Sequence, residues 1–184
     1  MAAGASARTG GAPRLGGAFA RQALLDFLVH LGVELQVSKH TVAAYRSDLV
    51  RLLADAPHLP DRHELERHLA TLLKSHAAAS VARAAAACRG FYRFLYSEGL
   101  LAADEAEGLL GPRLEQRLPK ALSRSAIARL IRAGGDGPLA PRDDALLHVL
   151  YATGCRVGEL IALRTGSVLP EQRLLRCFGK GNKE

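Results

Sequence analysis

The sequence predicts a mainly α-helical protein with two domains. Alanine and leucine dominate its 184 residues and β-branched residues are sparse, a composition typical of helices. Apolar residues recur at helical spacing through the first two thirds of the chain, and a short β-like run appears only at 174–178. Hydrophobic residues make up 48% of the sequence, which is enough to build folded cores.

The chain is basic, with 25 lysines and arginines against 18 aspartates and glutamates and a net charge of +7. This balance favours a polyanionic partner, and nucleic acid is the default choice, although many basic proteins bind none. No apolar run approaches the roughly 20 residues needed to span a bilayer, so no membrane partner is expected.

The three cysteines, Cys88, Cys155 and Cys177, are isolated in the sequence. They have no C-x-x-C spacing, and their number is odd. We therefore expect buried thiols in a reducing cytoplasm, without a disulfide framework or a metal site.

Residues 1–20 are predicted to form a disordered basic tail. They are rich in alanine, glycine and serine, and they contain Arg8 and Arg14 but no acidic residue. A mitochondrial transit peptide has the same composition, so targeting is the alternative to a flexible tail. The segment has no apolar stretch of the kind that a secretory signal needs.

Four amphipathic helices are expected to close a first domain over residues 21–106. The first helix covers 21–31 and ends near Gly32, where the apolar periodicity stops. The second helix follows Ser38, a good N-cap. Its apolar residues fall on one face: Val42, Tyr45, Leu49, Leu52 and Leu53.

The third and fourth helices have their own start signals. Asp61 and Glu64 resemble a capping box at the start of the third helix. Ser80 is expected to cap a longer fourth helix that runs to Tyr96. Its inward-facing residues are predicted to be Val81, Ala84, Ala85, Cys88, Phe91, Tyr92 and Leu95.

Basic residues mark one end of the second helix. Its first turn carries Lys39 and His40, where acidic residues are the usual choice. This turn could dock on a DNA phosphate, with Arg46 reaching the same backbone or a base edge, and a solvated basic turn is the alternative. The candidates for DNA contact on the helices are Lys39, His40, Thr41, Arg46, Arg83 and Arg89.

Residues 107–120 are predicted to be an interdomain linker. Glycines and prolines lie among charged residues there, and the periodicity is lost. An extended basic linker could track DNA between two domains, with Lys120 as the candidate contact. A merely solvated linker is the alternative.

Residues 121–184 are expected to begin a second domain. Ser123 is a helix cap, and Pro141 suits the first turn of the next helix. That apolar helix is expected to end at Gly154, which tolerates a positive φ.

Two cations near the end of the chain are candidates for one anion site. Arg156 starts a short helix, where an arginine gains nothing from the helix dipole, so its position suggests an anionic partner. The run 174–178 leads into Gly-Lys-Gly-Asn, which is expected to be a hairpin turn with Lys180 at its lip. A planar guanidinium suits a phosphate.

Four segments resemble the tyrosine recombinases of the phage integrase and Xer class. Residues 152–160 read A-T-G-C-R-V-G-E-L, and residues 179–184 read G-K-G-N-K-E. Residues 41–49 resemble the T-x-x-x-Y-x-x-D-L helix of the family's DNA-clamping domain, and 117–123 resemble the R-L-P-K-x-L-S segment that leads into its catalytic domain. The resemblance implies a four-helix SAM-like DNA-clamping domain, a linker, and the incomplete start of an α+β catalytic domain.

The resemblance also implies a reaction. In the family a tyrosine hydroxyl attacks a DNA phosphodiester and forms a 3′-phosphotyrosine, and no metal or other cofactor takes part. By position, Arg156 would stabilise charge in the transition state and Lys180 would protonate the leaving 5′-oxygen. Glu159 is expected to have a structural role. The implied partners are double-stranded DNA and, in the parent enzyme, the other protomers of a homo- or hetero-tetramer.

Other motifs of the family are not found in the sequence. The 184 residues contain no H-x-x-R pair and no tyrosine at the place of the family nucleophile, so this chain is expected to bind DNA without cleaving it. Ser167 stands where relatives usually have an aspartate, which leaves the hydrogen bonding of that loop open. The alternatives are a stand-alone, non-catalytic DNA-binding module or regulator, and a helical protein-interaction domain.

Overall fold

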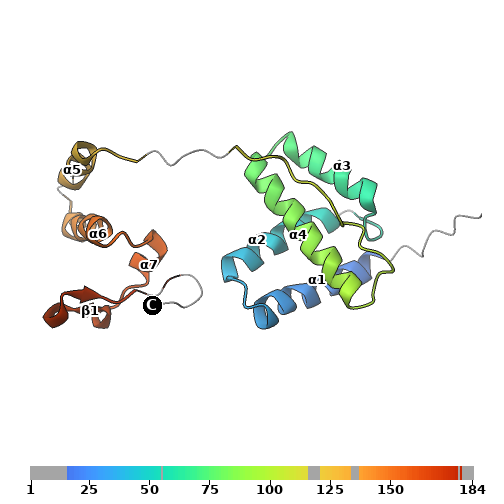
Figure 1. The fold of residues 1–184 in the computed structure, drawn as a ribbon, viewed down its shortest axis with the longest axis horizontal. Helices are drawn as coiled ribbons and strands as arrows, with labels where there is room; N and C mark the ends of the chain where they lie inside the picture. Colours follow the sequence, from blue (N-terminus) through green and yellow to red (C-terminus); the bar gives the residue numbers. More distant parts are fainter. Residues whose placement is uncertain (1–15, 55, 116–120, 134–136, 178, 180–184) are drawn as a thin grey trace, which may run out of the picture. The chain divides into compact units, whose positions relative to one another are not determined.

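The computed structural model describes residues 16–54, 56–115, 121–133, 137–177 and 179 (Figure 1). The chain divides into two compact units, Met1–Gln116 and Arg117–Glu184. The described residues form seven α-helices and one two-stranded sheet, so the prediction of a mainly helical protein is confirmed. Most of the predicted basic tail, residues 1–15, lies outside the described residues.

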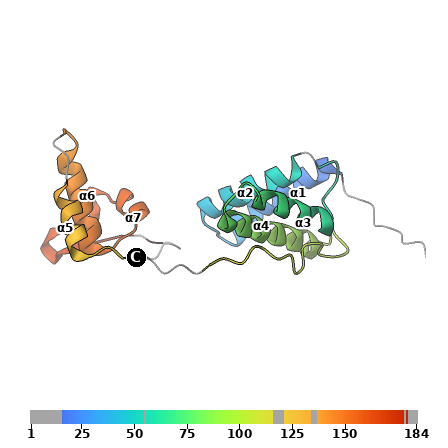
Figure 2. The same cartoon turned by 90° about the horizontal axis from the view of Figure 1, so that it is seen from above.

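The first unit is a bundle of four helices. Their bounds are α1 Gly17–Val29, α2 Lys39–Leu53, α3 Arg62–Leu73 and α4 Ala78–Ser97. Helix α4 contacts the other three helices; it runs across α1 and α2 in Figure 1 and lies among the helices of the bundle in Figure 2. It is therefore the central element of this unit.

Helix α1 begins earlier than the sequence pattern predicts. Its start is tied down because the Gly17 N–H donates to the Pro57 carbonyl at 3.1 Å, and because Ala20 is buried. The α-helix ends at Val29, three residues before the predicted end near Gly32, and the chain continues in a π-helical turn, His30–Glu34. The wider turn keeps Leu31 in the core while the backbone stays hydrogen-bonded.

Two of the predicted helix caps in this unit are confirmed. The Ser38 hydroxyl accepts the Thr41 N–H at 3.2 Å at the start of α2. At the start of α3, Asp61 Oδ1 accepts the Glu64 N–H at 2.9 Å and Glu64 Oε2 accepts the Asp61 N–H at 2.8 Å. This reciprocal pair is the capping box that the sequence indicates.

The predicted cap of α4 is wrong. The helix is capped by Ala77, whose extended backbone presents its carbonyl to the N–H groups of Ser80 and Val81 at 2.9 and 3.2 Å. Ser80 therefore lies inside the first turn. Ala77 makes no side-chain cap, so a search for capping side chains places the start of the helix too late.

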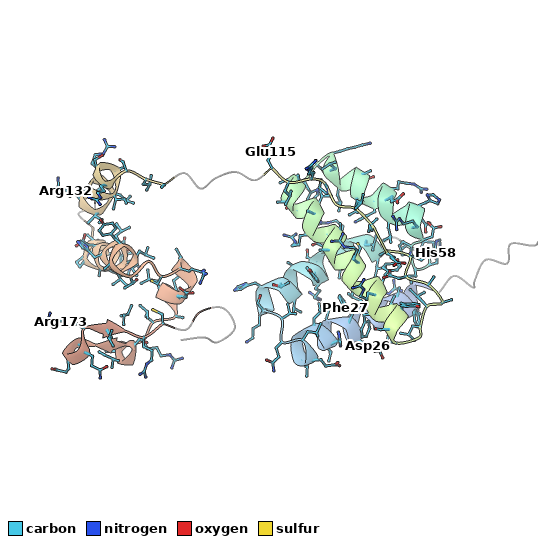
Figure 3. The ribbon with its side chains drawn as sticks, in the orientation of Figure 1. Asp26, Phe27, His58, Glu115, Arg132 and Arg173 are labelled. Carbon is cyan, nitrogen blue, oxygen red and sulfur yellow. The ribbon has the colours of Figure 1, made fainter. Side chains whose placement is uncertain are left out.

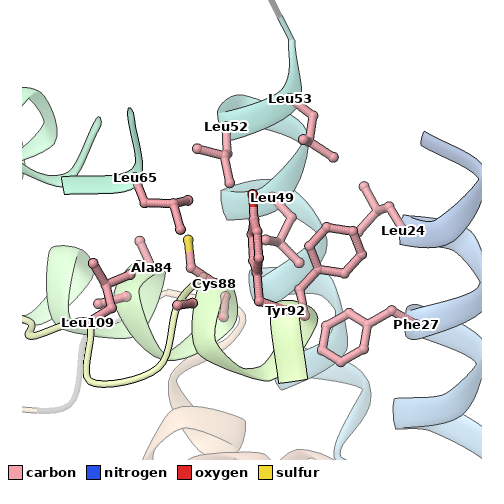
Figure 4. Packing of buried hydrophobic residues seen from close by; sticks show 14 of the residues in the cluster. Leu24, Phe27, Leu49, Leu52, Leu53, Leu65, Ala84, Cys88, Tyr92 and Leu109 are labelled. Atoms are coloured by element: carbon pink, nitrogen blue, oxygen red, sulfur yellow. The ribbon is translucent and has the colours of Figure 1, made fainter. Parts of the chain in front are cut away.

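The core of the first unit joins all four helices (Figure 4). Phe91 and Tyr92 of α4 are fully buried, and Phe91 lies 5.6 Å from the ring of Phe27 on α1. The Tyr92 hydroxyl donates to the Pro60 carbonyl at 2.6 Å, which satisfies its polar end inside the core. These aromatic side chains are core residues, as the helical spacing indicates, whereas Tyr96 is exposed.

The first residues of the expected linker pack against the bundle. Leu109 is buried, and Arg89 Nη1 donates to its carbonyl at 2.7 Å. Gly111 lies so close to α4 that an added Cβ would meet Ala82 Cα at 3.2 Å. The chain thus stays on the surface of α4 as far as Gly111, and the later linker residues 116–120 lie outside the described part.

The second unit contains three helices and a short hairpin. The bounds are α5 Arg124–Arg132, α6 Ala140–Thr153, α7 Val157–Ile161, β1 Val168–Leu169 and β2 Leu174–Leu175. The Ser123 hydroxyl accepts the Ala126 N–H at 3.2 Å, and Pro141 lies in the first turn of α6, as predicted. Gly154 closes α6 with a φ of 65°, the left-handed conformation that favours glycine.

The observed hairpin pairs Val168 with Leu175 and so lies earlier in the chain than the predicted hairpin turn at 179–182. Strand β2 pairs in antiparallel fashion with β1, a strand that the sequence pattern did not indicate. The Arg176 N–H donates to the Ser167 carbonyl at 2.8 Å and extends the pairing, and Arg173, at the turn, has a φ of 53° (Figure 3). Of the predicted turn 179–182, only Gly179 belongs to the described residues.

The second unit buries few side chains. Among its described residues only Leu160 is buried, and α5 and α6 have no buried residue. The exposed apolar side chains of this unit include Leu130, Leu139, Tyr151, Val157, Ile161, Val168 and Leu174. None of the helices in the described parts of the chain is both long and apolar enough to cross a membrane.

Candidate functional site

The turn before Arg156 is built by its neighbours. The Thr153 hydroxyl donates to the Val149 carbonyl at 2.7 Å and accepts the Cys155 N–H at 3.2 Å. Gly154 supplies the left-handed residue between them. The sequence A-T-G-C-R therefore makes a tight junction that ends α6 and places Arg156 at the N-cap of α7.

Arg156 presents its guanidinium to solvent. The side chain is 77% exposed, and Nη1 donates to Glu159 Oε1 at 2.7 Å. The Arg156 backbone N–H also donates to the same carboxylate, at Oε2, at 2.7 Å. One carboxylate thus orients both the backbone and the side chain of Arg156, and it leaves most of the five guanidinium N–H donors for an incoming anion.

Glu159 is held in its charged form. The hydrogen bond from the Arg156 backbone N–H is the main cause that lowers the pKa of this carboxyl, and the guanidinium adds to it. The arrangement agrees with the structural role expected for Glu159: it positions the arginine. The carboxylate of Glu159 would repel an anion that approached the guanidinium from its side. An anion is therefore expected to bind the guanidinium N–H groups that point away from Glu159.

The residues after β2 lead towards Lys180. Burial is the main cause that raises the pKa of Cys177, and Cys155 and Glu159 raise it further. Lys180 itself lies outside the described residues, so its role stays a prediction.

The prediction of three buried thiols is confirmed for one cysteine and wrong for two. Cys88 is buried in the first unit, as expected. Cys155 and Cys177 are half-buried, because the second unit covers few of its described side chains.

In the first unit, α2 presents a basic face. Lys39, Ala43, Arg46 and Val50 follow one another at helical spacing, and all four are exposed. His40 is also exposed, whereas Thr41 is half-buried and its hydroxyl lies 2.9 Å from that of Ser38. We call Lys39, His40 and Arg46 the α2 basic face. Within the described part of the chain, none of these three side chains forms an ion pair.

Two other predicted DNA contacts have partners inside the protein. Arg83 clasps Asp48 with two hydrogen bonds, Nε to Oδ2 at 2.9 Å and Nη2 to Oδ1 at 3.1 Å. The bond to Asp48 raises the pKa of Arg83. Arg89 donates to the Leu109 carbonyl. Both arginines therefore have a structural role, and their contact with DNA stays a prediction. Contact of Lys120 with DNA also stays a prediction, because Lys120 lies outside the described residues.

Asp48 has a structural role that the helical spacing of α2 did not predict. Its side chain is buried, 4% exposed, on the inward side of α2. The available signal was a charged residue beside the apolar positions Tyr45 and Leu49, since a charge on a buried face requires a partner.

A pocket of about 350 Å³ lies beside the C-terminal half of α2 and α3. Its lining includes the carboxylate of Glu64 and four basic side chains: Arg51, His58, Arg67 and His68. His58, visible in Figure 3, is hydrogen-bonded to Glu64 at 3.1 Å. Burial is the main cause that lowers the pKa of His68, and the charge of Arg51 lowers it further.

Comparison of the sequence with known proteins identifies relatives of this chain. Residues 24–99 match the family described as phage integrase, N-terminal SAM-like domain. Over 172 residues the chain is 41% identical to a tyrosine recombinase XerC of Azotobacter vinelandii, an alignment that covers 88% of this chain and 58% of the relative. A tyrosine recombinase XerC of Pseudomonas syringae is 38% identical, with 88% of this chain and 57% of the relative covered.

Among solved structures, a crystal structure of XerA recombinase is similar, with 26% identity and a TM-score of 0.39. That match covers 89% of this chain and 57% of the solved chain. The chain thus spans a little over half the length of the relatives that it matches. The SAM-like helical unit and the sequence identity over most of the chain agree, and the chain belongs to the tyrosine recombinase family.

Proposed function

We propose that this chain takes part in site-specific DNA recombination, as a DNA-binding portion of a tyrosine recombinase and as the source of the arginine at the cleaved phosphate. The observation that carries the proposal is the exposed Arg156 guanidinium at the start of α7, held by Glu159 through both backbone and side chain. The printed names of the relatives, tyrosine recombinases, support the same reaction class.

The chemistry of strand cleavage gives Arg156 its task. When a tyrosine hydroxyl attacks a phosphodiester, negative charge builds up on the non-bridging oxygens of phosphorus. A preorganised guanidinium can donate two hydrogen bonds to these oxygens, which a lysine cannot. The loss of one such donor typically costs about 10²–10³ in rate. Lys180 is proposed to protonate the 5′-oxygen that leaves.

Tyr92 is a poor candidate for the attacking hydroxyl. It is fully buried, it donates to the Pro60 carbonyl, and burial raises its pKa. The nucleophile is therefore not assigned to this tyrosine, and we propose that the H-x-x-R pair and the attacking tyrosine are contributed by sequence other than these 184 residues.

We propose that the α2 basic face meets the DNA. The first turn of a helix offers free N–H groups and the positive end of the helix dipole, and here it also carries Lys39 and His40. Arg46 lies two turns further along the same face, beside the small side chains of Ala43 and Ser47. Such a face can approach the phosphates and base edges of a groove without steric obstruction. We further propose that the recombinase works as a tetramer on two duplexes, in the cytoplasm.

Binding selection tests the DNA-binding part of this proposal. The purified chain is incubated with a pool of random-sequence duplexes, the bound fraction is amplified, and the affinity for the enriched sequence is measured over a range of salt concentrations. We expect an enriched consensus, and an affinity that falls steeply with salt. Absence of enrichment, for a chain shown to be helical by circular dichroism, would contradict the proposal.

Two substitutions that each remove one positive charge locate the interface. Lys39→Gln and Arg46→Gln should each weaken binding and reduce the slope of log affinity against log salt by about 1, because each removes about one phosphate contact. Lys74→Gln is the matched control, since Lys74 is exposed at the end of α3 and does not belong to the α2 basic face. If the control lowers the slope as much as the other two, the interface has been placed wrongly.

A further inference from the structure

The pocket beside α2 and α3 has no role in the proposed function. Its volume of about 350 Å³ lies within the range of about 300–1,000 Å³ that is typical of small-ligand sites. Arg51 comes from the last turn of α2, whereas Arg67 and His68 come from α3. Basic side chains of two helices therefore line one cavity of the first unit, which we call the α2–α3 pocket.

The α2–α3 pocket lies on a different side of α2 from the α2 basic face. Arg46 and Arg51 are five residues apart, which corresponds to about 140° around the helix axis. Lys39 and His40 lie at the opposite end of the helix, in its first turn. The pocket and the α2 basic face are therefore two separate surfaces of the same helix.

Hydrogen bonds to the rest of the unit hold the wall of the pocket in place. The Pro57 carbonyl accepts the Gly17 N–H at 3.1 Å, and the Pro60 carbonyl accepts the Tyr92 hydroxyl at 2.6 Å. Leu52 and Pro60, which also line the pocket, are buried. The pocket is therefore shaped before a ligand arrives, which lowers the entropic cost of binding.

The negative charge of Glu64 in the lining is already engaged. Its Oε2 accepts the Asp61 N–H at 2.8 Å, and its two carboxylate oxygens lie 3.1 and 3.2 Å from His58 Nε2. These bonds fix the carboxylate at the start of α3. Glu64 is therefore not the partner of the arginines in the pocket.

The arginines of the pocket are short of negative partners. Arg67 forms no ion pair within the part of the chain that the structure describes. Arg51 Nη1 lies 3.9 Å from Asp48 Oδ1, but that carboxylate accepts two shorter bonds from Arg83. Burial lowers the pKa of His68, the charge of Arg51 lowers it further, and Asp48 opposes this only in part. An anion in the pocket would restore the balance of charge.

We propose that the α2–α3 pocket binds the phosphate group of a small phosphorylated molecule. The guanidinium groups of Arg51 and Arg67 would each donate hydrogen bonds to the phosphate oxygens, and the His68 imidazole would donate one more. The apolar side chains of Leu52 and Pro57 would contact the rest of the ligand. A DNA phosphate has the same chemistry, so the test must separate the two sources.

Histidine resonances of the full chain test the proposal by nuclear magnetic resonance. Inorganic phosphate and pyrophosphate are titrated at constant ionic strength, and sodium chloride serves as the reference. The resonances of His68, one of seven histidines, are assigned by their absence from the spectrum of His68→Gln. We expect pyrophosphate to shift the His68 resonances in a saturable way. Those of His63, which is exposed on α3 outside the pocket, should not shift.

Two substitutions locate the binding groups. Arg51→Gln and Arg67→Gln should each weaken pyrophosphate binding by about fivefold or more, because each removes charge-assisted hydrogen bonds. Arg93→Gln is the matched control, since Arg93 is an exposed arginine of α4 that does not line this pocket. In a further titration with saturating duplex DNA, pyrophosphate should still shift the His68 resonances.

Three results would overturn the proposal. The first is no saturable shift at His68, or an equal shift with chloride, in a chain whose helical content is confirmed by circular dichroism. The second is an equal loss of affinity in Arg93→Gln, which would indicate general attraction by a basic protein. The third is displacement of pyrophosphate by the duplex, which would make the pocket a contact for the DNA backbone. The wild-type titrations decide the question even if a glutamine variant fails to fold.

Discussion

Among the described residues, Asp48 is the only buried charged side chain, and it connects α2 with α4 in the first unit. Removing a carboxylate from water costs several kcal/mol unless hydrogen bonds and an opposite charge replace the lost hydration. Arg83 of α4 supplies both through its two bonds, and Arg51 Nη1 lies 3.9 Å away. The pair therefore holds α2 and α4 in one relative position.

Loss of the Asp48 charge should destabilise the protein. We expect Asp48→Asn to lower the free energy of unfolding by about 2 kcal/mol, below the full effect of breaking a buried pair because Arg83 is 45% exposed and can be hydrated. Urea unfolding followed by circular dichroism measures the change. The control is Asp26→Asn on the surface of α1, which should change stability by less than about 0.5 kcal/mol. Equal effects of the two substitutions would remove Asp48 from this role.

His68 should make stability depend on pH. Its pKa is lowered from 6.5 in the folded protein, mainly by burial, so the unfolded chain binds the proton more readily. Stability is then fully present above pH 6.5 and declines as the pH falls through 6.5 towards the folded pKa. We expect His68→Gln to flatten this decline when urea unfolding is compared at several pH values.

The exposed His63 on the same helix provides the control for that experiment. His63→Gln should leave the decline unchanged, because an exposed imidazole stays hydrated in the folded protein. Glu64 acts in a separate window: its pKa is lowered from 4.5, chiefly by the hydrogen bond from the Asp61 backbone N–H, so its contribution is lost only at more acidic pH. A decline that persists unchanged in His68→Gln would show that another group is responsible.

The two units differ in how well their helices are covered. Helix α4 buries eight residues, whereas α5 and α6 bury none among the residues that the structure describes. Helix propensity and caps alone rarely stabilise helices of 9 and 14 residues in water. The exposed apolar side chains on α5 and α6 are surface that a complete core would cover.

We therefore expect the two units to behave differently as isolated fragments. Residues 16–115 should unfold in urea in one cooperative transition. Residues 121–184 should show little helical signal and no cooperative transition, because Leu160 is the one buried residue in the described part of this fragment, and its burial cannot offset the entropy of ordering the chain. Circular dichroism of the two fragments measures this. A sharp transition of the second fragment would contradict the burial argument.

The elements that follow from local chemistry were predicted well. The caps Ser38, Asp61 and Ser123 and the helix end at Gly154 were all read from single residues whose side chain or φ preference acts within one turn. Where tertiary contacts decide the boundary, the pattern failed. Helix α1 starts early because its first turn bonds to Pro57 and packs in the core, which no local signal records.

For the candidate site as well, features encoded by adjacent residues were predicted, and contacts between distant residues were not. Arg156 at a helix start was predicted, because the junction after Gly154 is encoded in adjacent residues. The two hydrogen bonds from Arg83 to Asp48 were not predicted, because they join residues that only the folded chain brings together. Resemblance to a family indicated the reaction class, but it carried no information on these contacts.

Each unit contributes one part of the proposed function. The first presents the α2 basic face, and the second presents Arg156 with its supporting carboxylate. DNA binding and strand cleavage are therefore separable by substitution. A change at Arg156 should affect cleavage and spare binding, and a change on the α2 basic face should first affect binding.

Strand cleavage by an Arg156→Lys enzyme is the most direct test of the account. Residues 1–184 replace the matched portion of the Azotobacter vinelandii relative, and formation of the covalent protein–DNA complex is followed on a duplex that the hybrid protein binds. Arg156→Lys should slow this step by about 100-fold or more, with DNA affinity within about threefold, because lysine cannot replace the two-point contact to phosphate. Arg164→Lys, an exposed arginine beyond α7, should leave the rate unchanged. An Arg156→Lys enzyme that cleaves as fast as its parent would contradict the central claim.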